Sequence, residues 1–86
     1  MHFSQDHLAV LRAIEEAGGA LTLSEIVDGL DPGVMTAPGM EFARRSIRCA
    51  QVAGELHRMG LIERRPLSNQ RILTEQGRAA LAREVG

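Results

Sequence analysis

One stretch, Glu41 to Arg65, constrains the fold of this chain most; it reads EFARRSIRCAQVAGELHRMGLIERR. Apolar or small side chains recur in it at helical spacing, and these are Phe42, Ser46, Cys49, Ala53, Leu56 and Gly60. Gly60 predicts the end of the helix, because glycine readily adopts the positive φ common at helix C-termini. Leu61 and Ile62 then predict a strand with a charged end. The stretch therefore predicts a long helix followed at once by a basic strand.

The residues before this stretch predict two shorter helices and one very short strand. Ser4 can cap a first helix that runs to about Ala17, with Phe3 and Leu8 as a hydrophobic staple. Residues 21–23 alternate like a strand, and Thr22 or Ser24 can cap the second helix. Residues 31–40, with two prolines and two glycines, predict a loop. The long helix is then expected to begin at Pro38 or Gly39 and to end near Met59.

The residues after it predict a β-hairpin and a last helix. Strands are expected at 61–65 and 71–73, with residues 66–70 as the tip, because proline fits a strand end and not a central strand. Thr74 can cap a final helix over 75–84, buried through Ala79, Leu81 and Ala82. We predict one domain, 1–86, that is mainly α with a small β-hairpin. Its order is helix, strand, helix, helix, strand, strand, helix.

Composition limits the setting in which the chain works. No run approaches the ~18 apolar residues of a membrane span, and the first residues do not resemble a secretion signal. A single cysteine cannot form an internal disulfide, which favours a reducing, cytoplasmic location. No membrane partner is expected.

Charge is divided along the chain. Residues 1–41 carry one arginine against seven acidic residues, a net −6, whereas residues 42–86 carry nine arginines against four, a net +5. This asymmetry favours a basic face for a polyanion, with the acidic excess lying mainly away from the arginines of the long helix. The alternative is that the two halves simply neutralise each other.

The C-terminal half resembles a known type of domain. MGLIERRPLSNQRILTEQGRAAL is similar to the end of winged-helix DNA-binding domains of bacterial multiple-antibiotic-resistance-type regulators, in its GLIER strand and in LTEQGR at the start of a helix. The resemblance is clear over residues 41–82 and looser over 8–30. It implies that the long helix enters the major groove of duplex DNA and that the hairpin contacts phosphate or the minor groove. The ten-residue connection 31–40 departs from the short turn of the family, so the angle of the long helix is left open.

The candidate DNA-binding residues lie in these two elements. Arginine can pair with guanine, glutamine with adenine, and serine with either base or phosphate. The long helix supplies Arg44, Arg45, Ser46, Arg48 and Gln51, and the hairpin supplies Arg64, Arg65, Asn69, Gln70 and Arg71. A solvated helix face and a charged hairpin edge are the alternatives.

Other chemistries find little support in the sequence. Cys49 on the inward stripe is expected to be a buried apolar residue rather than a redox sensor. The three histidines lack metal-ligand spacing, no catalytic motif is present, and no cofactor is expected. Only two phenylalanines are available for stacking, which favours duplex DNA over single strands.

Two functions remain as hypotheses. The first is a small DNA-binding transcription regulator, for which a homodimer through the first and last helices would bind half-sites about one helical turn apart. The second is a winged-helix module for protein contact, which the near-neutral net charge of −1 and the acidic first half favour. The sequence does not identify an operator, an effector or the regulated genes.

Overall fold

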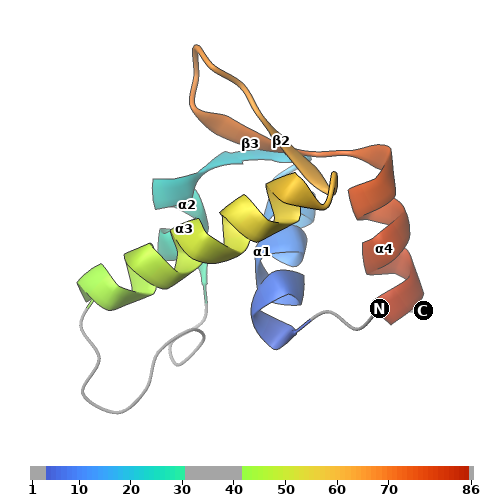
Figure 1. The fold of residues 1–86 in the computed structure, drawn as a ribbon, viewed down its shortest axis with the longest axis horizontal. Coiled ribbons are helices and arrows are strands. Elements are labelled where there is room, and N and C mark those ends of the chain that lie inside the picture. The colour runs from blue at the N-terminus through green and yellow to red at the C-terminus, as the bar shows by residue number, and fades with distance from the viewer. Residues whose placement is uncertain (1–3, 31–41, 86) are drawn as a thin grey trace.

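The computed structural model describes residues 4–30 and 42–85, and of residues 42–44 and 85 it describes the backbone alone. Within these ranges the chain is mainly helical, with four helices and one small antiparallel sheet (Figure 1). The elements are α1 (Gln5–Glu16), β1 (Ala20–Thr22), α2 (Leu23–Gly29), α3 (Phe42–Arg58), β2 (Ile62–Arg64), β3 (Gln70–Leu73) and α4 (Glu75–Val85). This is the predicted order, and it is compatible with a winged-helix layout.

Side-chain caps start three of the helices. The Ser4 hydroxyl accepts a hydrogen bond from the His7 backbone N–H at 3.2 Å at the start of α1. Thr22, not the alternative Ser24, caps α2, and Glu25 completes a capping box by accepting from the Thr22 N–H at 3.0 Å. Thr74 caps α4 by accepting from the Gly77 N–H at 3.0 Å. These caps satisfy backbone donors that have no partner inside a helix.

The sheet is larger than the predicted hairpin. It has three strands in the order β1-β3-β2, with β3 antiparallel to both neighbours. The register pairs Ile62 with Leu73 on one side of β3 and Ala20 with Ile72 on the other. The short first strand thus extends the hairpin, and it covers the edge of β3 that would otherwise present unpaired backbone groups.

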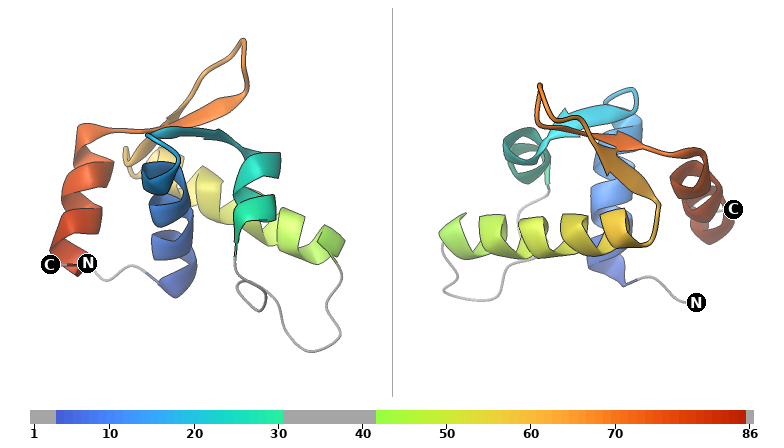
Figure 2. Two further views of the ribbon diagram at one scale, coloured as in Figure 1. Left: turned by 180° about the vertical axis from the view of Figure 1, so that it is seen from behind. Right: turned by 45° about the horizontal axis from the view of Figure 1, so that its top comes forward.

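The core lies between the sheet and the helices. Figures 1 and 2 show α3 crossing the molecule below the sheet, with α1 beside it and α4 at one end. The largest fully buried side chains come from α1, α2, α3 and β2, and these are Leu11, Ile14, Ile26, Leu56, Ile62, Val10, Val52 and Cys49. The prediction that Cys49 is buried is confirmed. The hairpin of β2 and β3 projects beyond this core.

Two sequence predictions need correction, and three others lie outside the described residues. In α4 it is Ala80 and Leu81 that are buried, whereas Ala79 and Ala82 are exposed, because the helix is turned from the predicted face. Gln70 belongs to β3 and not to the hairpin tip. The loop 31–40, the start of the long helix at Pro38 or Gly39, and Phe3 of the predicted staple lie outside the described residues.

Candidate nucleic-acid interface

The outer face of α3 is less basic than predicted. The exposed side chains there are Ile47, Ala50, Gln51 and Arg58, with half-buried Gly54 between them; we call these five residues the outer face of α3. Ile47 is the largest apolar group of this face and is 60% exposed. Among the predicted contacts on this helix, Gln51 alone is on the outer face. Arg45 and Ser46 are half-buried, and the Arg44 side chain lies outside the described residues.

Arg48 lies on the flank of α3 that faces α1. Its Nε donates to Asp6 Oδ2 at 3.0 Å, and the two side chains are 38% and 29% exposed. Two turns further along α3, His7 Nε2 lies 2.8 Å from Glu55 Oε1. The Ser4 N–H donates to His7 Nδ1, so Nε2 is the nitrogen that donates to Glu55. These two pairs fix α1 against α3 and occupy Arg48.

Asp6 is an exception to one expectation about charge. The acidic excess of the first half was expected to lie mainly away from the arginines of the long helix, and Asp6 lies directly against one of them. Sequence spacing could not show this, because the two residues are 42 positions apart. Arg48 therefore supports the packing of two helices, and its availability for DNA is reduced.

Asn69 organises two arginines of the hairpin. Its φ of 58° is left-handed, a conformation that asparagine tolerates better than most residues. Its Oδ1 accepts from Arg64 Nε at 3.0 Å, and its backbone oxygen accepts from Arg71 Nη1 at 2.8 Å. Arg64 and Arg71 are also cross-strand partners in the sheet register. Two like charges are thus held side by side by the oxygens of one residue.

A third arginine reaches the same region from α3. Burial raises the pKa of the Cys49 thiol, and the positive charges of Arg45 and Arg71 act in the opposite direction. Burial also lowers the pKa of the Arg71 guanidinium, and the neighbouring charge of Arg64 lowers it further. Arg64 and Arg71 are thus neighbours on the hairpin, and the charges of Arg45 and Arg71 both act on the Cys49 thiol in the middle of α3. We call these three residues the arginine cluster.

The remaining predicted contacts lie on the hairpin itself. Arg65 is exposed just before the tip, and half-buried Gln70 begins β3, where its Oε1 accepts from Ser68 Oγ at 3.3 Å. The prediction missed two exposed apolar residues, Ile47 on α3 and Leu67 at the tip. Ile47 falls outside the buried stripe of the helix, so its spacing already signalled exposure. Leu67 lies between proline and serine in a turn, and this position likewise indicated that its side chain is exposed.

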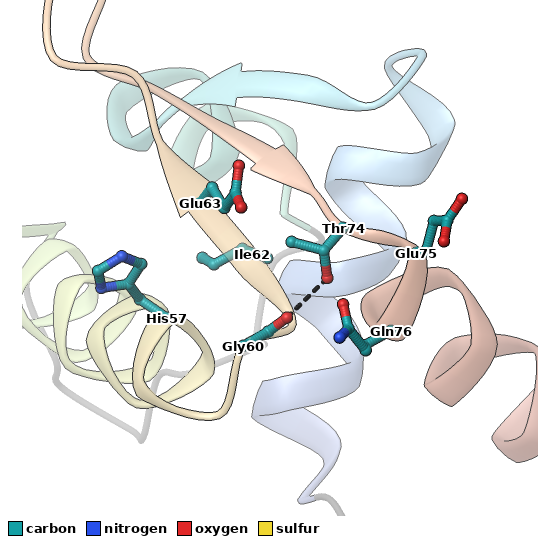
Figure 3. Close-up of a pocket in the computed structure, with 7 residues that line it drawn as sticks. All are labelled: His57, Gly60, Ile62, Glu63, Thr74, Glu75 and Gln76. Carbon is teal, nitrogen blue, oxygen red and sulfur yellow. Dashed lines mark hydrogen bonds between the residues drawn. The ribbon is translucent and has the colours of Figure 1, made fainter.

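A concave site lies at the end of the sheet where β2 begins and β3 ends. His57, Gly60, Ile62, Glu63, Thr74, Glu75 and Gln76 line an open pocket of about 500 Å³ (Figure 3). Within it the Thr74 hydroxyl donates to the Gly60 carbonyl at 2.7 Å. Within residues 4–30 and 42–85 no three His, Cys, Asp or Glu side chains gather closely enough to hold a metal ion. The pocket thus presents acidic groups at the end of the sheet opposite the arginine cluster.

The buried thiol predicts a loss of stability at alkaline pH. The folded state keeps the Cys49 proton to higher pH than the unfolded chain, so its stabilising effect is complete below the usual pKa of 9.0 and declines as the pH rises towards the folded value. Urea unfolding midpoints of wild type should fall between pH 9 and 10 more steeply than those of Cys49→Ala. A thiol reagent should also react slowly with the native protein at neutral pH. Rapid labelling together with oxidant-sensitive DNA binding would instead indicate a redox switch.

Comparison of the chain with protein-family models, with curated proteins and with solved structures gives no match. None of the helices in the described part of the chain is long and apolar enough to cross a membrane. The function therefore has to follow from the residues and geometry of this chain alone.

Proposed function

We propose that this chain is a small winged-helix protein that binds double-stranded DNA and regulates transcription. In this proposal α3 enters the major groove, and the β2–β3 hairpin is the wing on the backbone or the minor groove. The observation that carries the proposal is the hairpin part of the arginine cluster, in which Arg64 of β2 and Arg71 of β3 face each other across the strands and both donate to Asn69. Arginines held close together raise the local positive potential, and a polyanion relieves that repulsion.

Asn69 strengthens this argument, because it makes the arrangement specific. An arginine on a surface usually keeps considerable rotamer freedom, which it loses on binding. Here the acceptor oxygens of Asn69 already fix Arg64 and Arg71 at 3.0 and 2.8 Å. A phosphate oxygen could accept from the remaining N–H groups of both guanidinium forks. The wing would then lose less side-chain entropy when it binds the DNA backbone, because two of its arginines are already ordered.

The outer face of α3 defines what could read bases. Gln51 can pair with adenine through a bidentate contact, and the apolar side chains of Ile47 and Ala50 suit the methyl group of thymine. Arg48, first expected in this role, is held by Asp6 on the flank of the helix. The proposal therefore assigns base contacts to Gln51 and its apolar neighbours, and backbone contacts to the arginines.

A mobility-shift titration against random duplex at about 50 mM salt tests the proposal, since non-specific affinity should already be measurable there. We expect binding at micromolar protein that weakens steeply as salt is raised. Charge reversal of the cluster by Arg64→Glu should abolish the shift, whereas Arg83→Glu on exposed α4 should leave it nearly unchanged. Absence of any shift at low salt would eliminate duplex DNA as the ligand.

A protein-contact module is the second candidate, and Ile47 is the observation that favours it. An isoleucine 60% exposed beside Ala50 and Gly54 also suits a helix that packs against another protein. A homodimer through α1 and α4 stays a proposal of the same kind. Ala79 and Ala82 are small and exposed, so a second protomer could approach α4 closely. Sedimentation of wild type and Ile47→Glu distinguishes these surfaces, because only association through α3 would be lost in the variant.

A further inference from the structure

We propose that Leu67 at the tip of the wing is a wedge that enters the minor groove, partly unstacks a base step and bends the DNA. The inference rests on the proposed duplex binding and adds a deformation of the DNA to it. It starts from the most exposed large apolar side chain of the described residues: Leu67 is 102% exposed, more than Ile47 or Met59. In Figure 1 and in the left view of Figure 2 the hairpin tip stands clear of the helices.

The turn presents this side chain at a defined place. The Arg65 N–H donates to the Gln70 carbonyl at 2.8 Å, and the Asn69 N–H donates to the Arg65 carbonyl at 2.9 Å. Pro66 restricts φ just before Leu67, and Asn69 closes the turn in the left-handed conformation. The loop is therefore short, closed by hydrogen bonds at its base and stiffened on both sides of the leucine. A wedge needs this stiffness, because a flexible tip would bend instead of the DNA.

The charge around the tip favours an anionic partner. The hairpin, residues 62–73, contains three arginines against the single acidic residue Glu63. An apolar side chain at the end of a basic hairpin matches the chemistry of minor-groove proteins, in which cationic side chains hold the backbone while a leucine, isoleucine or proline enters a base step. The tip presents a single large apolar side chain and its adjacent proline. It is therefore small enough to enter a narrow groove while the strands of the sheet stay outside.

Other partners fit this tip less well. A membrane surface would bury one leucine, which is less apolar surface than a single acyl chain that by itself gives only marginal attachment. The core of a protein interface is depleted in charged residues, whereas Leu67 lies between flanking arginines. A duplex accommodates both chemistries, because its bases are apolar on their faces and its backbone is anionic.

Bending should be visible in a duplex labelled at both ends for energy transfer. A duplex of about 30 base pairs is well below the persistence length of about 150, so it is straight without protein. We expect wild type to bring the two labelled ends closer and so raise the transfer efficiency. The rise should correspond to a bend of about 20–90°, the range found for wedge-inserting proteins. Leu67→Ala should bind with little or no bend, and Leu67→Met, which keeps a long apolar side chain, should restore it.

A mismatched duplex gives an independent readout. A mismatch weakens the stacking of one base step before the protein binds. The affinity of wild type for the mismatched duplex should therefore exceed that for the intact duplex by roughly tenfold. Leu67→Ala should lose most of this preference while retaining the salt dependence set by the arginines. Met59→Ala, at an exposed apolar position after the end of α3, is the matched control and should behave as wild type.

The outcomes separate this inference from the proposed function. If wild type binds no duplex, the DNA-binding proposal fails, and the wedge fails with it. If wild type binds but does not bend DNA, or if Leu67→Ala bends it equally, DNA binding stands and the wedge is wrong. If Leu67→Ala instead changes only sedimentation with anionic phosphatidylserine vesicles, or only self-association, the tip serves a membrane or a protein, and the inference is overturned.

Discussion

Replacing Gly77 by alanine is expected to destabilise the fold by about 2–3 kcal/mol, the usual cost of forcing an extra methyl group into a packed site. A Cβ at this position would overlap the carbonyl oxygen of Leu61 and lie 2.8 Å from Leu73 Cδ1. The Leu61 carbonyl cannot easily move, because it also accepts the Thr74 N–H at 3.1 Å. For a small domain stabilised by about 5 kcal/mol, this is a large share of the total.

Gly54→Ala is the matched control and should have the opposite sign. Gly54 lies in the interior of α3, and the nearest atom to an added Cβ is Arg58 Nη1 at 3.9 Å. Alanine there should stabilise the helix by about 0.5–1 kcal/mol, because glycine loses more backbone freedom on folding. Urea unfolding followed by circular dichroism measures both variants. Equal and small effects of the two substitutions would show that α4 is not pressed against the start of β2.

The same contact gives a physical reason for one motif. The glycine of LTEQGR allows α4 to approach the backbone that leads into β2, while the threonine caps the helix and ties it to the Gly60 carbonyl at 2.7 Å. The cap is a local feature, which is why it could be predicted from sequence, whereas the contacts with Gly60 and Leu61 span 14 or more residues and could not. Ser4, Thr22 and the left-handed Gly60, with φ of 78°, are local features of the same kind as the cap.

Features set by distant residues could not be predicted in this way. The partner of Arg48 lies 42 positions earlier, and β1 joins β3 across some fifty residues of chain. The outer face of α3 depends on how the helix is rotated against α1 and α2, which a buried stripe fixes only approximately. The candidate site changed accordingly: the hairpin arginines stayed together, whereas of the two residues first expected to reach base edges, Arg48 and Gln51, Gln51 alone lies on the outer face. The arginine cluster itself became visible only once α3 lay beneath the sheet.

Gln51 and Arg65 are expected to affect DNA binding in different ways. Gln51 is exposed on the outer face of α3, where a bidentate contact to adenine would be worth about 1–3 kcal/mol of discrimination. Gln51→Ala should therefore lower the affinity for a selected sequence and reduce the ratio of specific to random binding. Arg65 is exposed beside the tip of the wing, where phosphate is the expected partner. Arg65→Ala should weaken all sequences alike and make the salt slope shallower by about one unit.

Titrations of both variants on a selected duplex and a scrambled one, at several salt concentrations, separate the two effects. Arg83→Ala removes an equally exposed arginine from α4, on another part of the surface, and controls for the change in net charge. If Arg65→Ala changes the sequence preference while Gln51→Ala does not, the wing reads the bases and α3 does not lie in the major groove. If Arg83→Ala lowers the salt slope as much as Arg65→Ala, binding follows the overall charge and not the wing. Only a loss of discrimination at Gln51, with a uniform loss at Arg65, fits a helix that reads sequence and a hairpin that holds the backbone.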